Sequence, residues 1–357
     1  MAMDKKEQLQ SLNALRFFFF LCVFFSHYVF NGERVLPNAG QFAVVFFLIL
    51  SGFSLSYGYG NEICTLNYNS FIRKRLLRLW PMQLLTLFLR AIIILIIPLV
   101  LGQFNLKDLI SFILKCFFLE AWVPDTQIIF NYNTCAWYLS PMVFCYLLFP
   151  WFYDWVIKAK KRHIIISIIS YIAIYVTFIF LIPSEKHQVF LYAAPYFRVF
   201  DFILGILAYR LFKSGFLNRL IYSKYCVASI TELTLLLFIA IVAWLPLEDV
   251  PPVLKMASLY WFPAFVVIVG AISLEESRKI RLMRGKLLQS AGDASYEMYM
   301  THLFVVSICQ HFAKAFIPDG NLALNLILLI ICLGISIALG LVVRHWFNVP
   351  VTNHFNK

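Results

Sequence analysis

Ten apolar stretches, each about as long as a bilayer is thick, constrain the fold of this chain more than any other feature. They lie at 12–30, 40–58, 78–101, 134–156, 164–183, 189–211, 227–246, 256–274, 293–313 and 321–346. A helix needs about 20 mostly apolar residues to cross the hydrocarbon core, where every backbone polar group must be satisfied within the protein. The sequence therefore predicts an all-α polytopic membrane protein with about ten transmembrane helices. Between the third and fourth stretches, 103–130 is amphipathic and is expected to lie at the membrane interface.

The charged residues agree with this class. They make up 13% of the chain, whereas about 25% is usual in soluble domains. The net charge of +12 does not indicate nucleic-acid binding, because the basic residues lie mainly in short loops between the apolar stretches. Most of them fall in alternate loops, so the positive-inside rule places both termini in the cytoplasm. We expect a single integral-membrane domain, 1–357, in a plasma (bacterial inner) membrane, without a cleaved signal peptide or an appended soluble domain.

The first apolar stretch carries a charge near its start and an imidazole near its end, Arg16 and His27. Eleven helical steps of about 100° return the two side chains to nearly one face, about 16 Å apart along the axis. Charged groups are costly inside a bilayer, so this face indicates a working surface and not a lipid-facing one. The pair predicts anion binding at the cytoplasmic end and proton chemistry at the outer end.

Two more arginines, Arg75 and Arg78, lie one helical turn apart at the cytoplasmic start of the third stretch. Membrane topology alone explains basic residues at this position. Together with Arg16, however, they would place three guanidinium groups on one side of the membrane, and guanidinium forks match the geometry of phosphates. Both interpretations stay open, and the second predicts a cofactor that carries phosphates.

Further polar and aromatic residues occur at membrane depth. Arg198 and Asp201 have the i, i+3 spacing of an internal ion pair, which is the favoured interpretation, although the pair can still line a cavity. Tyr299 and His302 share a helix face, and His302 is either a satisfied core residue or part of a shared polar cavity. Trp137 is either an interfacial anchor or a cavity residue.

The remaining intramembrane charges and the cysteines give weaker signals. Glu297 and Arg90 are a possible ion pair, which the sequence alone does not decide. The eight cysteines are scattered without a C-x-x-C pair or any metal-site spacing, so we expect small apolar packing residues. No metal site is predicted.

Six motifs of this chain, in order, resemble those of acyltransferase family 3, integral-membrane enzymes that O-acylate carbohydrates. The motifs are Leu12-Asn-Ala-Leu-Arg16 with His27, Phe46-Phe through Ser51-Gly-Phe53, Arg75-x-x-Arg78 with Pro81, Trp137-Tyr-Leu-Ser140 through Pro150, Arg198-x-x-Asp201 with Gly205, and Ser295-Tyr-x-x-Tyr299-x-x-His302. The resemblance covers most of the chain. Two departures are Met142 and Val143, where many members carry glutamates, and Asp201, which replaces a glutamate.

The resemblance implies a cytoplasmic acyl-CoA donor and an acceptor on the far side of the membrane. Arg16 and His27 match the essential pair of the family, and Arg75 and Arg78 match residues tied to the donor. We therefore expect an O-acetyltransferase that moves an acetyl group from acetyl-CoA to a hydroxyl of a cell-surface or lipid-linked carbohydrate in cell-envelope polysaccharide biosynthesis. His27 would be the general base.

The other candidate residues would shape the acceptor side: Arg198, Asp201, Trp137, Tyr299 and His302. Several alternatives stay open at this point. The donor could be succinyl-CoA, the transfer could pass through a transient acyl-enzyme, or an unrelated membrane fold could use a lipid acyl donor. A transporter or flippase for a lipid-linked sugar or a small anion would also use intramembrane arginine, aspartate and histidine.

Overall fold

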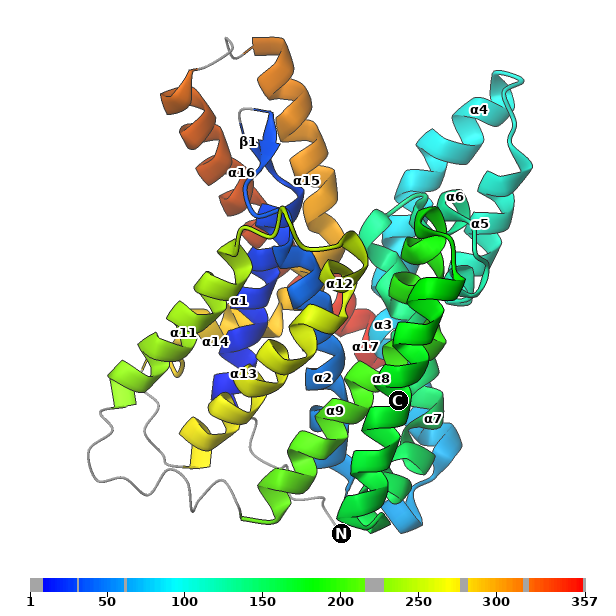
Figure 1. The fold of residues 1–357 in the computed structure, drawn as a ribbon. Coiled ribbons are helices and arrows are strands. Elements are labelled where there is room, and N and C mark those ends of the chain that lie inside the picture. Colours follow the sequence, from blue (N-terminus) through cyan, green and yellow to red (C-terminus); the bar gives the residue numbers. More distant parts are fainter. Residues whose placement is uncertain are drawn as a thin grey trace.

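The computed structural model describes residues 9–30, 32–60, 63–215, 228–276, 282–316 and 321–355, and within these ranges the chain is almost entirely helical (Figure 1). The predicted all-α class is confirmed. A single two-stranded antiparallel hairpin, β1 (Val29–Phe30) with β2 (Glu33–Arg34), is the only sheet among the described residues.

Each of the ten predicted stretches coincides with a helix. The longer helices are α1 (Gln10–His27), α2 (Ala39–Tyr59), α3 (Tyr68–Ala91), α7 (Leu139–Lys158), α8 (Lys161–Leu181), α9 (Pro195–Lys213), α11 (Ala228–Trp244), α13 (Ser258–Glu276), α15 (Ser295–Phe316) and α16 (Leu322–Val343). The shorter elements are η1 (Ile63–Thr65), η2 (Ile92–Ile96), α4 (Ile97–Val100), α5 (Leu106–Cys116), η3 (Glu120–Trp122), α6 (Thr126–Phe130), η4 (Thr134–Tyr138), η5 (Ser184–Lys186), η6 (Gln188–Ala193), α12 (Pro252–Met256), α14 (Lys286–Asp293), η7 (Arg344–Asn348) and α17 (Val349–Phe355).

The count of ten spans is not confirmed. Six helical segments of the described chain are long and apolar enough to cross a membrane, and a pair bent by 45°, η6 with α9, makes a seventh if it is counted as one span. The six are Ala39–Tyr59, Tyr68–Val100, Thr134–Lys158, Lys161–Leu181, Pro252–Glu275 and Leu322–Phe355.

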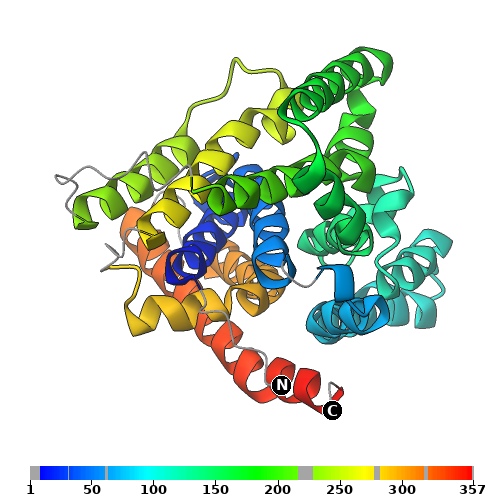
Figure 2. The ribbon, with the colours of Figure 1, turned by 90° about the horizontal axis from the view of Figure 1, so that it is seen from below.

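Three helices that match predicted spans are absent from that set. Helix α11 is absent because its apolar part, Glu232–Trp244, is short, and α1 and α15 are absent because of the polar residues they carry. Arg16 lies within α1, and Glu297 and His302 lie within α15. Seen from below, α1 lies in the middle of the bundle, with α2, α13 and α15 around it (Figure 2). A helix that its neighbours shield from lipid can carry polar groups at membrane depth. Helices α1 and α15 carry four of the candidate site residues, Arg16, His27, Tyr299 and His302.

The segment predicted to lie at the interface, 103–130, folds into α5, η3 and α6 beside α3. Its amphipathic helix α5 is anchored by a lysine that is fully buried: Nζ of Lys115 donates to the carbonyl of Ile129 at 2.7 Å and lies 3.9 Å from Glu120 Oε1. The attraction between the two charges and the hydrogen bond of Lys115 offset part of the hydration energy that both groups lose on burial. The segment is therefore tied into the protein as well as amphipathic.

Helices α2 and α9 cross with their backbones in direct contact. A Cβ atom added at Gly52 would collide with the carbonyl oxygen of Phe202, and one added at Gly205 would collide with the carbonyl oxygen of Ile49. Small residues allow this close approach between helices in a membrane, as the glycines of the second stretch suggest. The contact fixes α2, which lines both cavities described below.

The close contact of α2 with α9 leads to a prediction about stability. Gly205→Val is expected to lower the free energy of unfolding by about 3 kcal/mol, the upper end of the usual range for overpacking, because the opposing atoms are backbone and cannot rotate away. The measurement is the midpoint of thermal unfolding of the purified protein in detergent. Gly334→Ala is the matched control, since a Cβ there meets nothing within 4 Å. Equal midpoints for the two variants would contradict the packing described here.

Candidate active site

Three predicted arginines line one cavity of about 240 Å³ between α1, α2, α3, α7 and α15. We call this the basic cavity. Its lining is Arg16, Phe47, Leu50, Ser51, Ser54, Leu55, Gly58, Tyr59, Arg75, Arg78, Leu79, Tyr138, Leu139, Met142, Tyr146, Asp293, Ser295, Tyr296 and Tyr299. The structure thus brings Arg16 together with Arg75 and Arg78, which are about 60 positions away in the sequence.

The three guanidinium groups are held differently. Arg75 is half-buried: its Nη2 donates to the hydroxyl of Tyr59 at 2.8 Å, and its Cζ lies 5.8 Å from the ring centre of Phe71. Arg16 is also half-buried, whereas Arg78 is exposed at the cavity wall. Packing of a guanidinium against aromatic rings limits its motion without using all of its donors, so this wall is suited to an anion with several oxygens.

A second cavity of about 410 Å³ lies at the other end of α1. We call it the histidine cavity. Its lining is Val23, Ser26, His27, Arg34, Pro37, Gly40, Gln41, Val44, Phe130, Thr134, Cys135, Trp137, Gln188, Tyr192, Tyr299 and Leu303. Apolar and aromatic side chains with a few polar groups are typical of sites for small ligands.

Tyr299 is the residue that lines both cavities. Its hydroxyl donates to the backbone carbonyl of Cys135 at 2.8 Å, and its ring centre lies 5.8 Å from that of Tyr138 and 6.3 Å from that of Phe47. Tyr138 and Phe47 line the basic cavity only. We refer to Phe47, Tyr138 and Tyr299 as the aromatic partition. The predicted cavity residue Tyr299 is therefore at the boundary between two compartments.

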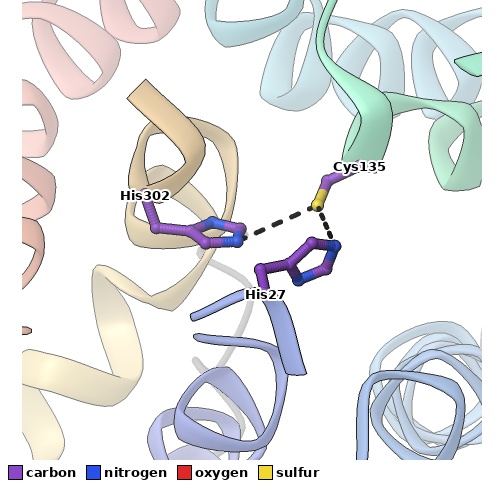
Figure 3. A group of neighbouring side chains, drawn as sticks. All are labelled: His27, Cys135 and His302. Atoms are coloured by element: carbon purple, nitrogen blue, oxygen red, sulfur yellow. Dashed lines mark hydrogen bonds between the residues drawn. The ribbon is translucent and has the colours of Figure 1, made fainter. Parts of the chain in front are cut away.

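Two histidines from distant helices face one cysteine (Figure 3). Cys135 Sγ lies 3.7 Å from Nε2 of His27 at the end of α1 and 3.9 Å from Nε2 of His302 in α15. The two ring centres are 5.4 Å apart. Cys135 and His302 are buried, whereas His27 is half-buried and lines the histidine cavity. Sequence analysis placed Cys135 among the packing cysteines. It is buried in the core as expected, and the structure adds its contacts with the two histidines.

The other ring nitrogen of each histidine is fixed by the backbone. Nδ1 of His27 lies 2.9 Å from the carbonyl oxygen of Val23, and Nδ1 of His302 lies 2.8 Å from that of Tyr299. A carbonyl oxygen only accepts hydrogen bonds, so Nδ1 of each neutral ring carries the hydrogen, an assignment that follows from the bonding pattern. Both Nε2 atoms therefore present a lone pair toward the thiol. These three atoms lie within 4.8 Å of one another, so the same donor set has the spacing of a metal site.

The predicted ion pair between Arg198 and Asp201 is present, at 2.5 Å, with both side chains almost fully buried. Neither residue lines the basic cavity or the histidine cavity, so their assignment to a substrate cavity stays a prediction. Arg198 instead lies 5.6 Å behind the ring of Tyr192, and that ring lies 4.7 Å from the ring of Trp137. The pair thus supports the aromatic wall of the histidine cavity from behind.

Trp137 lines the histidine cavity and is 4% exposed, so it is not an interfacial anchor.

The possible pair of Glu297 with Arg90 does not form. Arg90 packs on the ring of Phe304 at 4.6 Å, and Glu297 accepts from Asn348 and lies 3.9 Å from Arg344. Residues from η7 thus neutralise the carboxylate, which the sequence spacing gave no reason to expect.

Comparison with known proteins identifies the family of this chain. The model of acyltransferase family 3, described as an acyltransferase domain, matches residues 9–343. The chain is 25% identical over 325 residues to the acyltransferase MdmB of Streptomyces mycarofaciens, an alignment that covers 84% of this chain and 79% of that protein. No solved structure matches. The family match spans nearly the whole chain and includes every candidate residue, so this membrane protein belongs to acyltransferase family 3.

Proposed function

We propose that this acyltransferase is an O-acetyltransferase that moves the acetyl group of acetyl-CoA to a hydroxyl of a cell-surface or lipid-linked carbohydrate. The observation that carries the proposal is the pair of cavities on opposite sides of Tyr299, one with three arginines and one with His27. Two chemically different compartments at one boundary suit a reaction with an anionic donor and a neutral alcohol as acceptor.

The basic cavity would hold the donor. Arg16, Arg75 and Arg78 would bind the phosphates of CoA, because guanidinium groups make charge-assisted, bidentate hydrogen bonds to phosphate oxygens. The pantetheine arm would extend along α1 toward the aromatic partition and bring the thioester to the level of His27. Most basic loops lie on the side of the membrane where the basic cavity opens, and the positive-inside rule supports the cytoplasm as that side. Both termini would then be cytoplasmic. The membrane would be a bacterial inner membrane.

The histidine cavity would hold the acceptor. Trp137 and Tyr192 offer aromatic faces against which the C–H groups of a sugar ring can pack. His27 would act as the general base: its Nδ1 hydrogen bond to Val23 leaves Nε2 able to take the proton of an attacking hydroxyl near neutral pH.

The test is a comparison of cells with and without the gene. Mass spectrometry of the surface glycans is expected to show the loss of one acetyl group per repeating unit in the deletion strain, and the wild-type gene is expected to restore it. The mass difference names the donor group, since a succinyl group is heavier. Identical glycans in the two strains would contradict the proposal.

A transporter or flippase is the second candidate function, because buried arginine, aspartate and histidine occur in that class too. Its prediction is different: flux of a labelled lipid-linked sugar across vesicles containing the protein would persist in His27→Ala. If the protein is an acetyltransferase, neither the wild type nor His27→Ala is expected to show such flux. The family match favours an acyltransferase over a transporter.

A further inference from the structure

We propose that Cys135 is the acyl carrier of this enzyme: its thiol takes the acyl group from acyl-CoA and then passes it to the acceptor. This inference rests on the proposed function and adds a covalent intermediate to it. The juxtaposition that carries it is a single thiol between two histidine nitrogens, in the wall of the histidine cavity and next to Tyr299, which lines both cavities.

The first argument is the number of bases. A direct transfer to an alcohol needs one general base, yet two Nε2 lone pairs converge on this thiol. The thiol has one proton and can donate it to only one of them. A nucleophile within hydrogen-bond reach of a base that is itself oriented by a third group is the arrangement of covalent catalysis. Here the backbone carbonyls of Val23 and Tyr299 are the orienting groups.

The second argument is the different environment of the two bases. His302 is fully buried and lines neither cavity, and its Nε2 faces the thiol of Cys135. His27 is half-buried and lines the histidine cavity. The geometry assigns His302 to the activation of Cys135 and His27 to the activation of the acceptor hydroxyl.

The third argument is the aromatic partition. Donor and acceptor would occupy different cavities, and Tyr299 stands between them with its hydroxyl bonded to the carbonyl of Cys135. A carrier at the partition lets the two substrates react in turn, so they need not meet in one space. Cys135 of η4 is the nucleophilic side chain that lies next to Tyr299 and lines the histidine cavity.

The atoms and electrons balance without any redox partner. In the first step Nε2 of His302 takes the thiol proton while the sulfur attacks the thioester carbonyl; the carbon–sulfur bond to CoA breaks, and the leaving CoA thiolate takes the proton. In the second step Nε2 of His27 takes the proton of the acceptor hydroxyl while its oxygen attacks the Cys135 thioester. The thiolate released from Cys135 recovers that proton.

The experiment uses the purified full-length protein with labelled CoA and acetyl-CoA, without any acceptor. The wild-type protein is expected to exchange label between CoA and acetyl-CoA and to gain the mass of one acetyl group, mapped to Cys135. Cys135→Ala is expected to lose both signals. Cys135→Ser is expected to retain a stable acetyl ester, because an oxygen ester reacts more slowly than a thioester. Cys332→Ala is the control and is expected to keep both signals, because Cys332 is a buried residue of α16 that lines neither cavity.

Folding of Cys135→Ala is checked by its thermal protection by acetyl-CoA, which depends on the basic cavity alone. Three results would overturn the inference: no exchange by an active wild-type protein, full glycan acetylation by Cys135→Ala in cells, or one bound metal ion per protein that Cys135→Ala loses. The second leaves the proposed function intact and indicates direct transfer. The comparison of glycans in cells with and without the gene tests the proposed function separately. Unchanged glycans in the deletion strain would contradict the proposed function itself.

Discussion

Replacing His27 with alanine is expected to slow acetylation of the acceptor by about 10²- to 10⁴-fold, the usual contribution of a positioned general base. The variant keeps the basic cavity, whose lining does not include His27, so binding of acetyl-CoA is expected to be unchanged. The measurement is the amount of acetylated glycan in cells that express the variant at wild-type level. A loss of rate with an intact donor site identifies a group that acts on the chemistry.

His311→Ala is the matched control for this experiment, because His311 lies exposed on α15 and lines neither cavity. It is expected to retain wild-type acetylation. Normal acetylation by His27→Ala would remove the imidazole from the mechanism. Weakened binding of acetyl-CoA would instead mean that the substitution had disturbed the fold around α1.

Arg78→Ala is expected to weaken the binding of acetyl-CoA by about 10- to 150-fold, because a hydrogen bond to a charged group contributes about 1.5–3 kcal/mol. Arg78 is the exposed member of the three arginines, at the wall of the basic cavity, where a phosphate would meet it first. Acetyl-CoA is expected to raise the midpoint of thermal unfolding of the wild-type protein. The same concentration is expected to give little or no rise for Arg78→Ala.

Two further variants sharpen this result. Arg78→Lys keeps the charge but loses the planar fork, so partial protection is expected. Lys74→Ala removes an exposed charge from the same helix without touching either cavity, and full protection is expected. Equal loss in Lys74→Ala and Arg78→Ala would indicate general attraction between a basic surface and an anion, which salt screens. Full protection of Arg78→Ala would exclude this arginine from the donor site.

Local periodicity was enough to predict much of the site. The eleven-residue spacing from Arg16 to His27 predicts one helix face with its two ends at different depths, and the structure has one residue in each cavity. The i, i+3 spacing likewise predicts the ion pair of Arg198 with Asp201. Such predictions succeed because a single helix fixes the relative positions of its own side chains.

Contacts between helices that are far apart in sequence could not be predicted from helical spacing. Cys135 meets His27 from 108 residues away and His302 from 167 residues away, and no single-helix spacing encodes such a meeting. For the same reason the partner of Glu297 was not found. The count of ten spans stays unconfirmed, because α1 and α15 carry polar residues inside the bundle and so fall short of the hydropathy of a lipid-exposed span.

The aromatic partition also bears on the energetics of the host cell. A continuous aqueous passage from one cavity to the other would let protons and salt ions run down their gradients, and a membrane potential could not be sustained. Rings packed at the narrowest point exclude water and thereby raise the barrier to any hydrated ion. If the acyl group passes from one cavity to the other as proposed, the rings of Phe47, Tyr138 and Tyr299 would let it pass while the electrical insulation of the bilayer is preserved.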